Sequence, residues 1–160
     1  MSEIITNVQL RQIQPSDLPQ LFEFQRDAES NQMAFIHPRS RQDFDEHWEK
    51  VLVDPTVTVR AILAEDNLAG SISCYHSEGS NYIGYWLGRQ FWGRGIATAA
   101  LRMLLDEVDT RPLLSRVAVT NIGSIRVLEK CGFQEVRRQW SPATQRFAAC
   151  EEVLMELLST

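Results

Sequence analysis

The stretch "FWGRGIATAAL", residues 91–101, places two glycines around an arginine and runs directly into an alanine-rich helix pattern. Glycine loses more backbone freedom on folding than any other residue, so Gly93 and Gly95 at a helix start need a structural reason. The first N–H groups of a helix lack partners within it, and the peptide dipoles leave partial positive charge there. An anion can approach these groups closely where no Cβ intervenes, and Arg94 would add a charged donor. The stretch therefore predicts a phosphate-binding loop, with a tight strand-to-helix turn as the alternative.

Two nucleotide-binding motifs match this loop only in part. Gly93, Gly95 and Thr98 follow the spacing of the dinucleotide fingerprint, which also needs an acidic residue at the end of the next strand. The predicted next strand, 115–120, is followed by Asn121 instead. A Walker loop needs Gly-Lys-Ser or Gly-Lys-Thr, and the sequence contains neither.

Hydrophobic periodicity predicts the elements on either side of the loop. Alternating apolar residues indicate strands, and apolar residues spaced by three or four indicate helices. We expect strands at 8–13, 57–64, 68–76, 81–88, 115–120, 133–140 and 150–158, and helices at 18–28, 41–52, 96–108 and 121–131. Segment 29–40 is expected to be a loop. Ser16 or Asp17 can cap the first helix, Asn121 can cap the last, and Gly132 can end it in the left-handed conformation.

Composition limits the classes of protein to which the chain can belong. Its 160 residues suit one domain, and 44% hydrophobic with 23% charged residues is typical of a globular protein. A net charge of −5 without a basic cluster argues against nucleic acid as a partner. Cys74, Cys131 and Cys150 have no metal-site spacing, so we expect free thiols and no metal. No signal peptide and no run of ~20 apolar residues are present, which predicts a cytoplasmic protein without membrane segments.

A family resemblance rests on two motifs in order. "YWLGRQFWGRGIATAALRMLL" (85–105), followed after a strand by "NIGSIRVLEKCGF" (121–133), resembles the GNAT superfamily of acetyl-CoA-dependent N-acetyltransferases. Within it, the sequence is most similar to the branch of ribosomal-protein N-terminal acetyltransferases. The resemblance implies an α+β fold over residues 1–160 as a single acetyl-CoA-dependent N-acetyltransferase domain. Its mixed, largely antiparallel sheet would have six to seven strands, helices on both faces and a splayed central strand pair.

The resemblance also implies a coenzyme A site. The family loop pattern fits Gln90 to Gly95 literally, and it fits Trp92 to Ala97 with tryptophan at its first position. The second register is preferred because it leaves the preceding strand its usual length. Backbone N–H groups of 92–97 would then hold the pyrophosphate, and the strand end 85–87 would bond the pantetheine arm like an added strand. The implied cofactor-binding residues are Tyr85, Trp86, Leu87, Trp92, Gly93, Arg94, Gly95, Ile96, Ala97 and Asn121. Gly84 and Gly88 indicate either a bend or a bulge in this strand.

The catalytic groups are less clearly marked. In many GNAT enzymes a tyrosine seven residues beyond the motif asparagine supplies a proton to the departing CoA thiolate. In this sequence Leu128 stands at that position. The branch resembled offers Ser124 as a stabiliser of the CoA thiolate, with helix capping as the alternative role. Some members have a glutamate base where Arg116 stands. Candidate bases are His37, Glu46, His76 and Glu78, with a surface or structural role as the alternative for each, and His47 is less attractive.

The acceptor side has several candidate residues before position 57. Phe35, Ile36, Phe44 and Trp48 could line it or belong to the core, and Asp43, Asp45 and Glu46 would favour a cationic acceptor. The expected reaction is direct acetyl transfer to a primary amine of a small molecule or a protein N-terminus. A non-catalytic acyl-CoA-binding module with the same fold is the alternative. The oligomeric state does not follow from these residues, and a homodimer stays open.

Overall fold

One seven-stranded sheet organises the chain in the computed structural model, which describes residues 7–159. Its strand order is β1-β2-β3-β4-β5-β7-β6. All neighbouring strands pair antiparallel except β4 and β5, so the sheet is mixed and largely antiparallel, as predicted. The strands are β1 (Val8–Arg11), β2 (Thr58–Ala64), β3 (Asn67–Ser77), β4 (Ser80–Leu87), β5 (Leu113–Ala118), β6 (Gln134–Ser141) and β7 (Cys150–Leu157).

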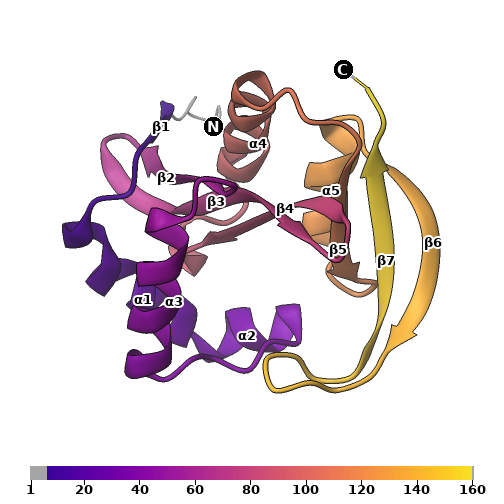
Figure 1. Cartoon of the computed structure of the whole chain (residues 1–160), viewed down its shortest axis with the longest axis horizontal. Helices are drawn as coiled ribbons and strands as arrows, with labels where there is room; N and C mark the ends of the chain where they lie inside the picture. Colours follow the sequence, from indigo (N-terminus) through magenta and orange to yellow (C-terminus); the bar gives the residue numbers. More distant parts are fainter. Residues whose placement is uncertain (1–6, 160) are drawn as a thin grey trace, which may run out of the picture.

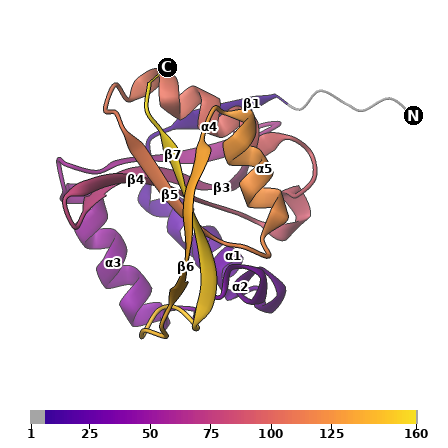
Figure 2. The same ribbon diagram turned by 90° about the vertical axis from the view of Figure 1, so that its right-hand side faces the viewer.

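Helices cover both faces of the sheet (Figures 1 and 2). On one face lie α4 (Ile96–Glu107) and α5 (Ile122–Lys130), and on the other lie α1 (Leu18–Arg26), α2 (Ala28–Ala34) and α3 (Arg41–Val53). The larger core cluster packs α4 and α5 onto the sheet, and Leu101 and Leu104 of α4 are fully buried in it. A smaller cluster centred on Phe44 and Trp48 packs α1 and α3 onto the opposite face. The predicted α+β fold class is confirmed.

The sheet opens between β4 and β5. Tyr82 and Leu114 form the one backbone pair described between these parallel strands. Just beyond it, the hydroxyl of Ser115 donates to the carbonyl oxygen of Ile83 at 3.2 Å. From that point the two strands diverge, which confirms the predicted splayed pair. On its other side β4 pairs with β3 continuously from Ser80 to Leu87, so Gly84 marks no bulge there.

Segment 29–40, predicted to be a loop, holds all of α2 except its first residue, Ala28. Asp27 caps this helix by accepting hydrogen bonds from the backbone N–H of Ser30 at 3.0 Å and from its hydroxyl at 2.7 Å. The helix ends at Phe35, which is left-handed with φ of 57°. Its sequence, "AESNQMA", has no stripe of large apolar residues, and this absence explains why periodicity missed it. The first helix accordingly ends at Arg26 rather than at 28.

Asp17, one of the two predicted caps, stands at the N-cap position of α1, but its side chain makes no capping bond to the first turn. Asp17 is buried instead and binds the guanidinium of Arg11 in two contacts, of 2.7 and 2.8 Å. Both carboxylate oxygens of Asp17 are thus engaged in a charge-assisted pair with Arg11 rather than with the helix N–H groups. The predictions for the last helix are confirmed: Asn121 caps it by accepting from Ser124 N–H at 3.4 Å, and Gly132 is left-handed with φ of 97°.

Candidate active site at the splayed strands

A groove of about 1110 Å³ passes through the opening between β4 and β5. Its walls come from both strands, the glycine loop with the start of α4, α5, α2 and the β6–β7 connection. Of the predicted cofactor residues, nine line it, namely Tyr85, Trp86, Leu87, Trp92, Gly93, Gly95, Ile96, Ala97 and Asn121. The structure therefore brings together two segments that the sequence separates, the loop and the α5 motif.

The glycine loop has the geometry of an anion cradle. Gly93 and Gly95 have φ of 74° and 76°, and a Cβ on either would meet no heavy atom within 4 Å. None of the backbone N–H groups of residues 93–98 donates a hydrogen bond to another residue in the range 7–159. Helix α4 has no acidic residue in its first turn and no side-chain cap. Open space, unpaired donors and the helix dipole together fit a phosphate group.

The basic side chains that line the groove near this cradle are not the one expected from the sequence, Arg94. The Arg94 guanidinium lies 5.6 Å from the centre of the Phe91 ring, and Arg94 is absent from the groove lining described for residues 7–159. Arg126 and Lys130 of α5 line the groove instead. The sequence shows these two residues four apart on one helix, which is the signal that could have identified them.

Two hydroxyl groups meet within the groove. The phenol oxygen of Tyr85 on β4 lies 2.6 Å from Oγ of Ser124 on α5. Burial raises the pKa of Tyr85, and the hydrogen bond with Ser124 opposes that rise in part. Ser124 donates its backbone N–H to the Asn121 cap, while its side-chain hydroxyl contacts Tyr85, so one residue serves both roles. Leu128, at the position of the missing tyrosine, is fully buried in the core.

The four predicted base candidates lie outside the groove lining. His37 and His76 are exposed, with His76 bonded to Asn81 at 3.1 Å. Glu46 is exposed on α3, and Glu78 lies in the β3–β4 turn, 3.4 Å from Arg116. The sequence reasoning did not select Glu152 of β7, which does line the groove and accepts a hydrogen bond from Ser141. Its side of the sheet depends on pairing with β5, where it lies opposite Ala118.

The predicted acceptor residues separate into two groups. Ile36 lines the groove, whereas Phe44 and Trp48 belong to the smaller core cluster. Phe35 ends α2, and its carbonyl accepts from Ala148 N–H at 2.9 Å. The acidic residues of α3, Asp43, Asp45 and Glu46, are absent from the groove lining described. Asp45 is bonded to Arg41, and Glu46 is bonded to Gln42. Tyr75, Tyr82 and Arg116 line the groove on the same face as α2.

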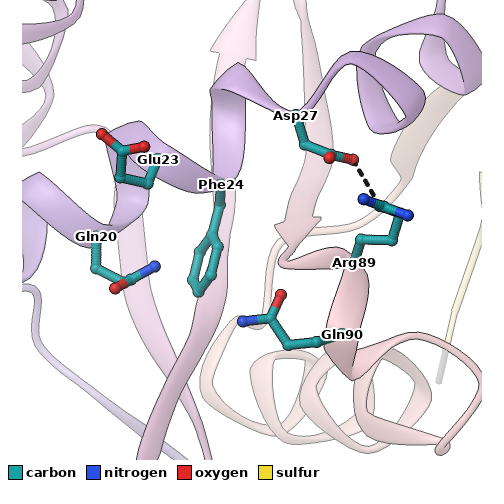
Figure 3. Close-up of a pocket in the computed structure, with 6 residues that line it drawn as sticks. All are labelled: Gln20, Glu23, Phe24, Asp27, Arg89 and Gln90. Atoms are coloured by element: carbon teal, nitrogen blue, oxygen red, sulfur yellow. Dashed lines mark hydrogen bonds and ion pairs between the residues drawn. The ribbon is translucent and has the colours of Figure 1, made fainter.

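A second, smaller hollow of about 490 Å³ lies beside the loop (Figure 3). It is formed by α1 and by η2 (Arg89–Phe91), the short helix that precedes the glycines. Arg89 bonds the carboxylate of Asp27 at 3.0 Å across its rim, and also Glu29 at 3.0 Å. These ion pairs connect the junction of α1 and α2 to the residues that lead into the cradle.

Comparison with protein families assigns this architecture. Residues 7–134 match the family described as "Acetyltransferase (GNAT) domain". The chain belongs to the GNAT acetyltransferases. It is therefore an acyltransferase with acetyl-CoA as its co-substrate. The predicted family is confirmed by a match that covers most of the chain.

Individual relatives agree with the GNAT assignment. The chain is 28% identical over 144 residues to the "Putative ribosomal N-acetyltransferase YdaF" of Bacillus subtilis (strain 168), with 81% of this chain and 79% of that one covered. The structure of spermidine N-acetyltransferase from Vibrio cholerae with CoA and spermine is similar at a TM-score of 0.80, 19% identity and 95% coverage of both chains. RimL, a ribosomal L7/L12 alpha-N-protein acetyltransferase in complex with coenzyme A, has a TM-score of 0.78 at 19% identity, covering 95% of this chain and 94% of its own. At these identities the two structures show the shared fold. No helix described in residues 7–159 is long and apolar enough to cross a membrane.

Proposed function

We propose that this GNAT protein transfers an acetyl group from acetyl-CoA directly to a primary amine, on a small molecule or a protein N-terminus. The observation that carries the proposal is one groove lined both by the phosphate cradle at the start of α4 and by a carboxylate, Glu152, on the opposite face of the sheet. The names of its relatives support an amine acceptor, since they include a ribosomal N-acetyltransferase and a spermidine N-acetyltransferase.

The cofactor residues act through the backbone in this proposal. The N–H groups of 92–97 would hold the pyrophosphate, with Arg126 and Lys130 adding positive charge. The edge of β4 at Tyr85, Trp86 and Leu87 faces the opening, where an amide-bearing pantetheine arm can bond as an added strand. Asn121 would stand beside this arm at the start of α5.

The chemistry needs a neutral amine and a stabilised leaving thiolate. A carbon–nitrogen bond forms as the thioester carbon–sulfur bond breaks, the ammonium loses two protons, and the departing sulfur takes up one. We assign Glu152 as the base that accepts the first proton from the ammonium, because its carboxylate lies in the groove on the acceptor face. The Tyr85–Ser124 pair is assigned to the thiolate, since either hydroxyl can donate to it while accepting from the other.

Release of free thiol from acetyl-CoA tests the proposal. The protein is incubated with single amines, including amino acids, polyamines and peptides with free N-termini, and CoA affinity is measured in parallel. We expect micromolar or tighter CoA binding and acceptor-dependent thiol release. Tight CoA binding without release for every acceptor would contradict transfer to an amine, and absence of CoA binding would contradict the assigned cradle.

Three further predictions concern the extent of the domain, its cellular location and its oligomeric state. One sheet with a core on each face supports residues 1–160 as a single acetyl-CoA-dependent N-acetyltransferase domain. Cytoplasmic location and a homodimer stay predictions, which localisation of a tagged chain and sedimentation of the purified protein can test.

A further inference from the structure

Charged side chains are few along the groove and unevenly placed. Four charged residues line it in the part of the chain described, Arg116, Arg126, Lys130 and Glu152. Arg126 and Lys130 belong to α5, beside the phosphate cradle. Arg116 and Glu152 belong to β5 and β7, and their strand neighbours Val117 and Val153 point into the core beneath α4 and α5. Because side chains alternate across a sheet, Arg116 and Glu152 face the opposite side, where α2 lies.

The sheet register places these two charges close together. Arg116 pairs with Leu154, and Ala118 pairs with Glu152, so Arg116 and Glu152 are diagonal neighbours on adjacent antiparallel strands. Diagonal neighbours lie roughly 7–8 Å apart, and their Cβ atoms are somewhat closer. The acceptor end of the groove therefore offers one cationic and one anionic group within the span of a small molecule.

Arg116 is held in place by an aromatic platform. Its Nη2 donates to the Tyr82 hydroxyl at 2.8 Å, and its guanidinium lies 4.9 Å from the centre of the Tyr82 ring. Tyr82 in turn stacks on Tyr75 at 5.8 Å. The link from Nη2 to the exposed Glu78 is long, at 3.4 Å. The Nε and Nη1 groups of Arg116 have no hydrogen-bond partner within residues 7–159.

An arginine positioned in this way selects for an anionic group. The Nε and Nη1 donors that remain can each donate a charge-assisted hydrogen bond to a carboxylate oxygen. A polyamine carries several positive charges, and Glu152 is the one acidic residue in the groove lining of the described chain. The acidic residues Asp43, Asp45 and Glu46, which suggested a cationic acceptor, do not line the groove in the described chain. Charge at the acceptor end thus fits a zwitterion better than a polycation.

We propose that the acceptor is a primary amine with a carboxylate close to its amino group, which Arg116 binds while Glu152 faces the ammonium. Two sources share this chemistry, a free amino acid and a peptide N-terminus whose first side chain is acidic. The inference rests on the proposed function, because it names the acceptor class for the same groove.

Matched acceptor pairs test this inference in the thiol-release assay. L-alanine is compared with L-alaninamide, and Glu-Ala-amide with Gln-Ala-amide, so each pair differs in one carboxylate. We expect kcat/KM to be at least tenfold higher for the carboxylate in one pair, and that pair identifies the source. Spermidine is expected to be a poorer acceptor than the preferred compound. Equal kcat/KM within both pairs, or a preference for spermidine, would overturn the inference while leaving amine acetylation intact.

Variants of Arg116 supply the second measurement. Arg116→Gln is expected to reduce the preference within the favoured pair to about twofold or less, mainly by raising KM for the carboxylate compound. Arg116→Lys should keep part of the preference, because it keeps the charge but loses the planar fork. Arg60→Gln is the matched control, since Arg60 bonds Glu107 at 2.9 Å and does not line the groove. A preference unchanged in Arg116→Gln would overturn the inference, and thiol release from no acceptor at all would overturn it together with amine acetylation.

Discussion

Tyr85 and Ser124 bring their hydroxyl oxygens within 2.6 Å of each other, from a strand and a helix on either side of the groove. The family tyrosine expected on the helix is absent, and Leu128 fills its place in the core. A phenol from β4 thus reaches the serine that the helix motif supplies. Because the two groups share one hydrogen bond, we expect their contributions to acetyl transfer to be coupled.

Removing either hydroxyl should slow transfer more than it weakens donor binding. Tyr85→Phe and Ser124→Ala are each expected to lower kcat about tenfold or more, with KM for acetyl-CoA changed less than threefold. The double variant should be little slower than either single variant, since groups that act as a unit are not additive. Steady-state kinetics of all four proteins test this. Additive losses would show that the two residues contribute independently. An unaltered kcat in Ser124→Ala would limit that serine to its capping role.

The phosphate cradle can be tested with a matched pair of glycines. Gly95→Val places a branched side chain in the groove and should raise the Kd for CoA at least tenfold, which is about 1.4 kcal/mol. Gly79 in the β3–β4 turn has a similar φ, 82°, and equally open surroundings, but it does not line the groove. Gly79→Val therefore carries comparable backbone strain without touching the cradle. Titration calorimetry should show near-normal affinity for Gly79→Val, and equal losses in both variants would attribute the effect to strain alone.

Glu152 as the proton acceptor predicts a specific pH dependence. Glu152→Gln should reduce kcat/KM at neutral pH about a hundredfold, because general base catalysis typically contributes that much. Raising the pH should restore part of the loss, since more of the amine is then already neutral in solution. Glu156→Gln is the control, because Glu156 lies four residues further along the same face of β7 and outside the groove lining. A full rate in Glu152→Gln would assign the proton to another group.

His47 should make the fold less stable under mildly acidic conditions. Burial, with the nearby charges of Arg39, Arg146 and Lys50, lowers the pKa of His47 from 6.5 to about 4. Between these values the unfolded chain binds a proton that the native state does not, so stability falls as pH decreases from 6.5 towards 4. Allowing for partial exposure, the loss is roughly 1–2 kcal/mol. Urea unfolding at several pH values should show it, and His47→Gln should flatten the slope between pH 6.5 and 5.

Local patterns in the sequence predicted most of the fold. The start of α4 at the glycines, the Asn121 cap and the left-handed Gly132 all depend on residues next to each other, and all are as expected. Helix α2 was missed because its sequence buries Ser30 and Asn31 rather than a stripe of apolar residues. Its stability depends on a cap and on packing, which periodicity does not report.

Sequence patterns predicted only the part of the site that is formed by residues close together in the chain. The cradle lies within one short segment, whereas the Tyr85–Ser124 contact joins residues 39 positions apart. Glu152 enters the groove because β7 pairs with β5 in one register, and a shift of one residue would turn it into the core. Hydrophobic alternation indicated that 150–158 is a strand, but it does not determine which neighbour that strand pairs with.

The opening between β4 and β5 also affects the stability of the fold. Past Tyr82 and Leu114, the edge of β4 has backbone groups that no neighbouring strand pairs with in residues 7–159. A pantetheine arm that bonds there would act as a missing strand, so acetyl-CoA would complete the sheet as well as supply the reactant. A ligand at a hundred times its Kd stabilises a fold by about 2.7 kcal/mol. The melting temperature of this enzyme would then follow the supply of its own donor.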